Sequence, residues 1–193
     1  MLLTWETSPL MQSMARAFVA IERRTANGNP PSHGFPSAVG LAMSACESGC
    51  RASVTGANNY FGIMRPPSFP GDTQSAWCET TEYTTPSGLT RFRDDERATA
   101  VLINTAKGEY SMYRWFAAYP SLEAAVAAYV NLLTDSTHYH PSWLAYQKDG
   151  DADKFLQATC ATGYTTGPAF KVGIEIAPQQ SILHAVDMAR TEG

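Results

Sequence analysis

The sequence predicts an α+β fold in which helices predominate and one small β region is inserted after the second helix. Two observations carry this prediction. Segments on both sides of the middle of the chain place apolar residues at helical spacing, whereas residues 65–115 are rich in Thr, aromatic residues and turn-forming Pro and Gly. With 193 residues, the chain has the size of one domain. We therefore expect residues 1–193 to form a single domain, with a β lobe at about 65–115.

The expected helices follow from apolar stripes and from residues that favour helix starts and stops. Ser8 and Pro9 suit the N-cap and the first helical position, and an apolar residue recurs on one face after them. Similar signals recur four times further along the chain. Helices are accordingly predicted from Ser8, from Pro36 to Gly49, from Ser121, from Asp151 to Cys160 and from Gln179 to Arg190.

The middle of the chain has the composition of strands and turns. Residues 77–85 combine Trp, Tyr and several Thr, which favours a strand, and residues 86–88 favour a turn. Partner strands are expected within 89–92 and 99–104. The mixed charges of residues 91–97 predict a solvated face at this end of the β lobe.

Charge and hydropathy exclude several classes of partner. The formal net charge is −4 and no basic stripe is present, which argues against nucleic acid. No apolar run approaches the ~18 residues of a membrane span, so no membrane partner is expected. The first residues lack the basic and apolar regions of a signal peptide. Either a leader has been removed or export uses another route, such as phage lysis or a secretion system.

The cysteines and histidines give no metal-site pattern. The cysteines number four, and their spacing matches no familiar zinc arrangement. His138 and His140 form an H-x-H pair without an evident third ligand, so a surface loop is expected and neither metal nor cofactor is predicted. The cysteines are either free thiols or partly oxidised, and an oxidised pair is expected to include one of the first two. In order, they are Cys46, Cys50, Cys78 and Cys160.

Glu47 is the residue of this chain best suited to acid catalysis. It lies near the end of the helix predicted from Pro36, in which Val39, Met43 and Cys46 share one apolar face. Apolar surroundings disfavour the charged form of a carboxyl group and raise its pKa, as a general acid near neutral pH requires. The alternative is an exposed glutamate at the end of a helix that makes only a surface contact.

The residues around Glu47 begin a series of motifs in a characteristic order. A-x-E-S-G at residues 45–49 precedes N-N-Y-F-G-I at 58–63, and T-T-E-Y follows at 80–83. F-A-A-Y-P-S at 116–121 and G-Y-T-T-G-P at 163–168 complete the series. The combination resembles glycoside hydrolase family 73, the bacterial glucosaminidases that cut peptidoglycan.

The resemblance implies a lysozyme-like fold of two lobes and an endo-β-N-acetylglucosaminidase that cuts the GlcNAc-β-1,4-MurNAc bond. It implies Glu47 as general acid, Glu82 as the second carboxylate and Tyr164 as a residue close to the acid. Glycan strands are then the expected partner, and a monomer that acts in the periplasm or cell wall is expected. Residues expected to bind substrate are Asn59, Tyr60, Phe61, Gly62, Trp77 and Tyr83.

Several alternatives stay open at this point. Glu79 and Glu109 rival Glu82, and the acetamide group of the substrate could replace the second carboxylate altogether. A muramidase or lytic transglycosylase would cut the neighbouring MurNAc-β-1,4-GlcNAc bond. A non-catalytic wall-binding module is the third possibility, because the chain departs from the family pattern at Cys50-Arg51 and Gly167 and has extra residues at about 85–110.

Overall fold

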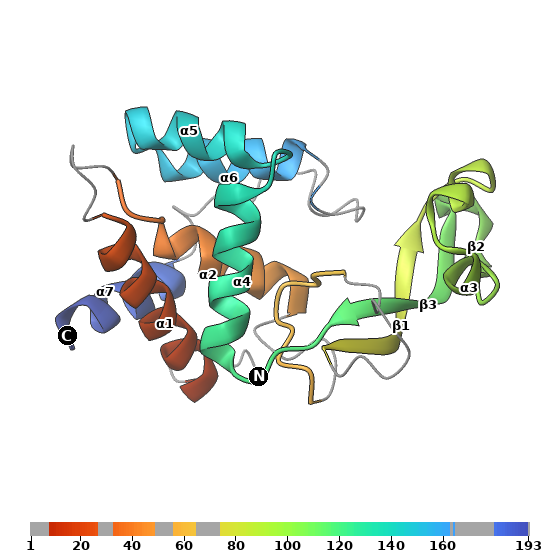
Figure 1. The fold of residues 1–193 in the computed structure, drawn as a ribbon, viewed down its shortest axis with the longest axis horizontal. Helices are drawn as coiled ribbons and strands as arrows, with labels where there is room; N and C mark the ends of the chain where they lie inside the picture. Colours follow the sequence, from red (N-terminus) through yellow and green to blue (C-terminus); the bar gives the residue numbers. More distant parts are fainter. Residues whose placement is uncertain are drawn as a thin grey trace.

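The computed structural model describes residues 8–26, 33–48, 56–64, 74–162, 164 and 180–192, with only the backbone for residues 46–48 and 180–181. Figure 1 shows most helices gathered in one lobe and the sheet extending from it as a second lobe. The described part of the chain holds seven helices and a three-stranded sheet that follows the second helix. The predicted α+β fold, predominantly helical with an inserted β lobe, is confirmed.

The helices begin close to where their sequence signals lie. Ser121, for example, precedes α4 and accepts a hydrogen bond from the backbone N–H of Ala124 at 3.2 Å. In the helical lobe, α5 is the one helix without a counterpart among the predicted ones, because its apolar residues form no stripe. The bounds of the helices in the helical lobe are α1 Pro9–Thr25, α2 Ser37–Ser48, α4 Leu122–Asp135, α5 His140–Asp149, α6 Ala152–Ala161 and α7 Gln180–Thr191.

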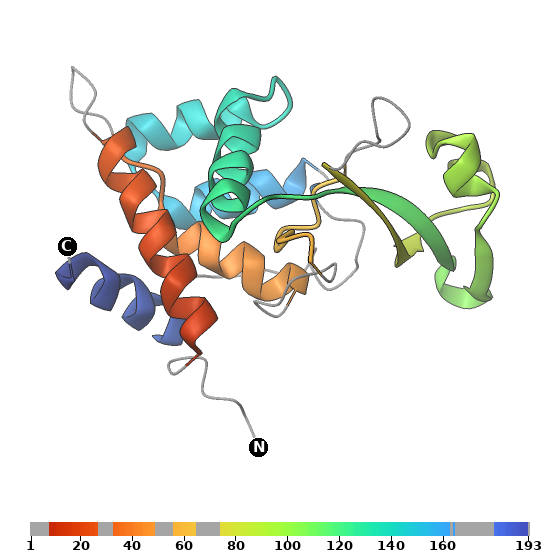
Figure 2. The ribbon, with the colours of Figure 1, turned by 60° about the horizontal axis from the view of Figure 1, so that its bottom comes forward.

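The sheet is antiparallel, with β3 (Glu109–Ala117) between β1 (Ser75–Tyr83) and β2 (Val101–Asn104). β1 and β3 pair along their whole length and form the long twisted ribbon in Figure 2. Strands were expected at 77–85 and 99–104, and both are present. The strand expected within 89–92 is wrong: residues 87–91 form a 3₁₀ turn there.

One face of the sheet is covered by the segment that connects β1 to β2. This segment contains the one-turn helix α3 (Asp94–Arg97), and Phe92 and Glu96 within it are 6% and 4% exposed. Phe92 and Glu96 lie on the same side of the sheet as Tyr110 and Met112 of β3, which are also buried. The prediction of a solvated face for 91–97 is therefore wrong at Phe92 and Glu96, because the sheet needs a cover on this side.

Aromatic rings fill the centre of the helical lobe. Phe18 of α1 packs edge-on against Phe61 and Tyr129, at centroid distances of 5.8 Å and 6.2 Å, and lies stacked at 6.0 Å from Phe35. All four rings are buried. Burying an aromatic side chain contributes on the order of 2–3 kcal/mol, so this group is a main source of stability for the lobe that carries α2.

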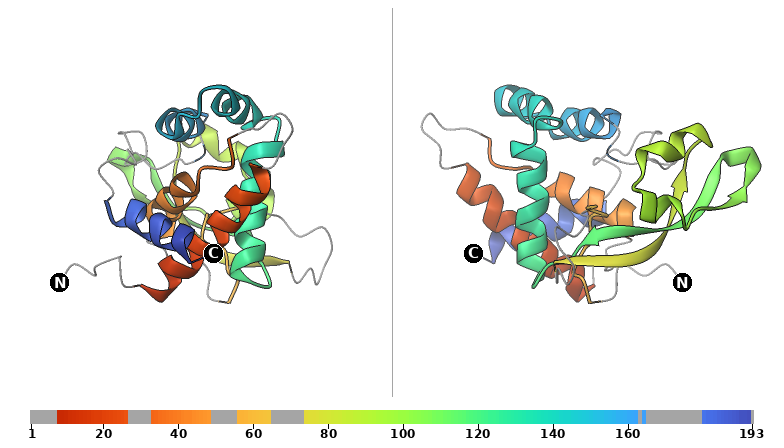
Figure 3. Two further views of the ribbon diagram at one scale, coloured as in Figure 1. Left: turned by 90° about the vertical axis from the view of Figure 1, so that its left-hand side faces the viewer. Right: turned by 45° about the vertical axis from the view of Figure 1, so that its right-hand side comes forward.

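The last helix, α7, lies along α1, as the two views of Figure 3 show. Arg190 of α7 donates to Glu22 of α1 at 2.8 Å, and Glu192 accepts from Arg16 at 3.2 Å. Beneath these pairs, Ile182 and Val186 bury their side chains in the same core as α1. In the described residues, no helix is both long enough and apolar enough to cross a membrane.

Gly40 sets the distance between α1 and α2. A Cβ atom at this position would lie 2.2 Å from the ring of Phe18, well inside the distance that real atoms adopt. Glycine therefore permits the close approach of the two helices, and with it the position of the α2 segment that leads to Glu47.

We predict that Gly40→Ala lowers the free energy of unfolding by roughly 1–3 kcal/mol, the usual cost of overpacking a core. Urea denaturation followed by circular dichroism measures it. Phe18→Leu should relieve the clash, so the double variant should be less destabilised than the sum of the two single variants. Strict additivity would contradict the proposed contact.

Candidate active site

The carboxyl-terminal end of α2 points toward the β lobe, and Glu47 is its penultimate residue. Figures 1 and 2 show this end of the helix approaching the side of the molecule where the sheet begins. The preceding turns bury Val39, Leu41 and Met43 completely, which anchors the helix. The side chain of Glu47 lies outside the described atoms, so its contacts stay a prediction.

The N-N-Y-F-G-I motif forms a loop that is bound to the end of β3. Asn59 is completely buried, and its Nδ2 donates to the carbonyl oxygens of Ile63 and Ala117, at 2.9 Å each. Its Oδ1 accepts the backbone N–H of Ile63 at 3.1 Å and that of Phe61 at 3.4 Å. The side chain of Asn59 thus closes the loop and ties it to the sheet, and it presents no surface to a ligand.

The other residues of the motif divide between the core and the loop backbone. Phe61 is 1% exposed and stacks on Tyr129 with centroids 4.2 Å apart, which leaves neither ring face open to a sugar. Gly62 has φ +63°, a left-handed conformation that favours glycine. Both residues were expected to bind substrate. The described contacts instead give Phe61 a role in core packing and Gly62 a role in the backbone conformation of the loop.

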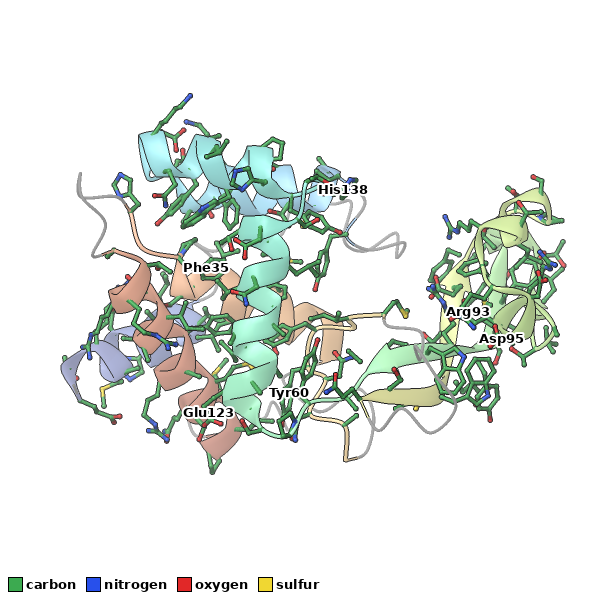
Figure 4. All side chains as sticks on the ribbon, in the orientation of Figure 1. Phe35, Tyr60, Arg93, Asp95, Glu123 and His138 are labelled. Carbon is green, nitrogen blue, oxygen red and sulfur yellow. The ribbon has the colours of Figure 1, made fainter. Side chains whose placement is uncertain are left out.

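Tyr60 belongs to the same loop and is buried, and its hydroxyl forms a hydrogen bond within the loop. Its ring is 7% exposed, and its hydroxyl donates to Oδ1 of Asn58 at 3.3 Å. Burial raises the pKa of Tyr60, with a smaller contribution from the charge of Glu123, and Figure 4 shows these two residues near each other. The hydroxyl therefore stays protonated at neutral pH and acts as a donor.

Tyr164 connects the region after α6 with the same loop. Its hydroxyl donates to the carbonyl oxygen of Phe61 at 2.8 Å, and its ring packs edge-on against Tyr129 at 6.0 Å. The structure thus brings the G-Y-x-T and N-N-Y-F-G-I motifs into direct contact. In this arrangement Tyr164 fixes the backbone of the loop that follows the α2 region.

Glu82, the expected second carboxylate, is buried inside the β lobe. It is 4% exposed and accepts from Nη1 of Arg114 at 2.7 Å. Nε of Arg114 lies 3.7 Å from the buried Glu96, and its guanidinium covers the ring of Phe92 at 4.6 Å. Removing one partner of such a pair would be costly, because the other charge would then stay buried without its counter-ion.

The two rival carboxylates lie on the opposite face of β1 and β3. Glu79 is exposed and accepts from the hydroxyl of Ser111 at 2.5 Å. Glu109 is half-buried and accepts from the hydroxyl of Tyr83 at 3.4 Å. Trp77 shares this face. The sheet therefore separates Glu82 from the other predicted residues of the β lobe, Trp77 and Tyr83.

The cysteines add no covalent link within the described residues. Cys78 and Cys160 are free thiols, and Cys160 Sγ lies 4.0 Å from Sδ of Met43. Cys46 is described only by its backbone and Cys50 lies outside the described residues, so the predicted involvement of one of them in a disulfide stays a prediction. The described part of the chain contains no group of three or more His, Cys, Asp or Glu residues that could hold a metal ion.

Comparison with protein families tests the family membership that the motifs indicate. Residues 25–176 match the family described as Glucosaminidase, mannosyl-glycoprotein endo-beta-N-acetylglucosaminidase. The chain belongs to this glucosaminidase family. The matched residues include α2, the Asn59 loop, the whole sheet and Tyr164, and the prediction of a glycoside hydrolase of this family is confirmed. No curated protein sequence matches the chain.

Solved structures share the fold at low sequence identity. An N-acetylmuramoyl-L-alanine amidase from Staphylococcus aureus aligns with a TM-score of 0.57 at 15% identity, over 96% of this chain and 44% of that one. The catalytic domain of the autolysin Auto from Listeria monocytogenes gives 0.52 at 17% identity, over 95% and 88%. A peptidoglycan hydrolase mutant from Sphingomonas sp. A1 gives 0.50 at 18%, over 93% and 96%. These likenesses confirm the lysozyme-like fold of the glucosaminidase chain.

Arg114 and Glu96 were not singled out from the sequence, although a signal for Arg114 exists. In β3, Tyr110, Met112 and Phe116 alternate on the covered face, and Arg114 falls in the same register. A charged residue in the apolar phase of a strand indicates a buried ion pair. Glu96 gives no such signal, because it lies in a short run of charged residues.

We predict that Asn59→Ala lowers the free energy of unfolding by roughly 3 kcal/mol, because several buried backbone groups lose their partners. Asn59→Asp should cost at least as much, since a carboxylate would face the carbonyl oxygens of Ile63 and Ala117. Urea denaturation measures both. Asn131→Ala, at an exposed position of α4, is the matched control and should not destabilise the protein; equal losses of stability at the two positions would contradict the role of Asn59.

Glu82→Gln is expected to destabilise the protein by roughly 3 kcal/mol, the order found when one partner of a buried pair is removed. Glu79→Gln is the matched control on the same strand and should change stability little, because that carboxylate is exposed. Thermal and urea unfolding compare the two variants. A Glu82→Gln protein as stable as wild type would show that the ion pair with Arg114 does not hold the β lobe.

Proposed function

We propose that the chain is a peptidoglycan hydrolase that cuts the GlcNAc-β-1,4-MurNAc bond of glycan strands, with Glu47 as the general acid. The observation that carries the proposal is the family match over residues 25–176, which contains Glu47 at the end of α2 and every motif downstream of it. Two of the structures with the same fold are called an autolysin and a peptidoglycan hydrolase, which supports peptidoglycan as the substrate.

The proposed reaction is hydrolysis of a glycosidic bond. Glu47 donates a proton to the departing oxygen while positive charge develops on the sugar ring. Val39, Ala42 and Met43 are buried and hold α2 in place, and the proposal includes apolar surroundings for Glu47, which would favour the protonated form of its carboxyl group. Asn59 and Tyr164 fix the loop that follows, so they act as positioning residues for the site.

The second group of the reaction is proposed to come from the substrate. Glu82 is buried and bound to Arg114, which argues against direct contact with a sugar in this conformation. The acetamide of the bound N-acetylhexosamine can stabilise the developing charge instead, an alternative known for some glycosidases. Glu82 then contributes through the shape of the β lobe. Cleavage of glycan strands further implies that the protein acts in the periplasm or cell wall.

The test is Glu47→Gln, which preserves the shape of the side chain and removes its proton. We predict normal folding, retained binding to purified sacculi and cleavage below a tenth of the wild-type rate, since general acids contribute about 10²–10⁴-fold. The alkaline limb of the pH–rate profile, where the acid loses its proton, should disappear or move. Glu192→Gln, directly after the remote α7, is the control and should cleave like wild type.

Mass spectrometry of the released fragments identifies the bond. A reducing GlcNAc end supports the proposal, whereas a reducing MurNAc or an anhydro-MurNAc end would identify a muramidase or a lytic transglycosylase. No release by the wild-type protein would support a non-catalytic wall-binding module. Retention of more than about a tenth of wild-type cleavage by Glu47→Gln would overturn the assignment of the acid.

A further inference from the structure

One face of the sheet carries aromatic residues where polar residues are expected. An antiparallel sheet with one covered face ordinarily presents polar side chains on the other. Here the covered face packs against Phe92, yet the opposite face carries Trp77 on β1 and Tyr113 and Trp115 on β3. Trp77 pairs directly with Trp115, and Tyr113 is the next residue of β3 on that face.

The three rings form one continuous surface. Trp77 lies 6.0 Å from Tyr113 with an angle of 24° between the ring planes, and 4.8 Å from Trp115. Tyr113 is 41% exposed, and both tryptophans are half-buried. Exposed groups of large aromatic residues of this kind mark binding sites more often than single surface residues do.

Hydrogen bonds hold Trp115 in place. Its indole Nε1 donates to Oδ2 of Asp95 at 3.0 Å, and Oδ1 of Asp95 accepts from Nε of Arg93 at 3.1 Å. The backbone N–H of Trp115 donates to Glu96 at 3.1 Å. The bond from Trp115 is the main cause that lowers the pKa of Asp95, so the acceptor stays charged at neutral pH. A ring fixed in this way loses little conformational entropy when a ligand binds.

The polar side chains beside the rings indicate which class of ligand this surface binds. Glu79 and Ser111 lie directly beside Tyr113 on the same face, and their side chains are hydrogen-bonded to each other at 2.5 Å. Carboxylate and hydroxyl oxygens accept hydrogen bonds from sugar hydroxyls, while flat rings contact the apolar faces of sugars. The nearby carboxylates of Glu79 and Asp95 and the net charge of −4 disfavour a nucleic acid, which needs cations for its phosphates.

We propose that Trp77, Tyr113 and Trp115 form a glycan-binding platform on the β lobe that holds N-acetylhexosamine units of the strand away from the bond that is cut. The identity of the ligand rests on the proposed function. In Figure 4, Arg93 and Asp95 lie on the β lobe, apart from the helices, and Trp115 of the platform is bonded to Asp95. A platform there adds contacts to a long strand beyond those at the cleaved bond.

The experiment measures binding of a β-1,4-linked GlcNAc hexamer to the full chain carrying Glu47→Gln, so that the ligand stays intact. Isothermal calorimetry and tryptophan fluorescence give the dissociation constant. Tyr113→Ala and Trp77→Ala are each expected to weaken binding about tenfold, the order of one lost aromatic contact, whereas Tyr113→Phe should bind like the parent. Leu102→Ala is the control, because Leu102 is also exposed, at 44%, but lies on β2.

The outcomes separate this proposal from the proposed function. Unchanged hexamer binding by both alanine variants would overturn the platform even if the wild-type protein cleaves sacculi. Tenfold weaker binding would support it even if the wild-type protein cleaves nothing. If Trp77→Ala fails to fold, Tyr113→Ala decides alone. Tighter binding of a single-stranded oligonucleotide than of the hexamer would also overturn the proposal.

Discussion

The buried amide of Asn59 is the interaction on which the arrangement of the two lobes depends. Buried backbone groups need partners, and this one side chain supplies them to the loop at 56–64 while it also binds Ala117 at the end of β3. Backbone bonds from Ala117 to Ile63 and from Tyr119 to Ala57 run alongside. The loop therefore behaves as an additional short strand, and it links the helix that carries Glu47 to the sheet. Tyr164 fastens the same loop from the helical side.

A second constraint shapes the β lobe. β2 pairs with only the first part of β3, so the edge of β3 beyond Ser111 needs other partners. Thr99 and Glu96 provide them by accepting the backbone N–H groups of Tyr113 and Trp115, at 2.8 Å and 3.1 Å. The segment at about 85–110 thus completes the sheet with side chains in place of a strand. Because Glu96 also faces Arg114, the same segment is coupled to Glu82, and the backbone of the proposed platform depends on it.

Much of the fold follows from local sequence signals, whereas the contents of the site do not. The stripe of α1, the serine before α4 and the Thr-rich β1 each carry their own signal, and each element lies where it is predicted. The strand expected within 89–92 is wrong because Phe92 is needed to cover the sheet, a tertiary demand that overrides local propensity. The burial of Phe61 and Glu82 could not be predicted either. A motif indicates that residues recur together, but only packing decides which of them face a ligand.

The packing of α7 against α1 has a consequence for how the chain folds. Arg190 meets Glu22 across 168 positions of the sequence, and Arg16 meets Glu192 across 176. Contacts between such distant segments form late and slow folding, because the loop between them must first close. During synthesis, the part of α1 that packs against α7 stays uncovered until α7 has left the ribosome. The nascent helical lobe is thus a candidate for chaperone capture, and α2, which also contacts α7, acquires its final packing only after α7 has joined the lobe.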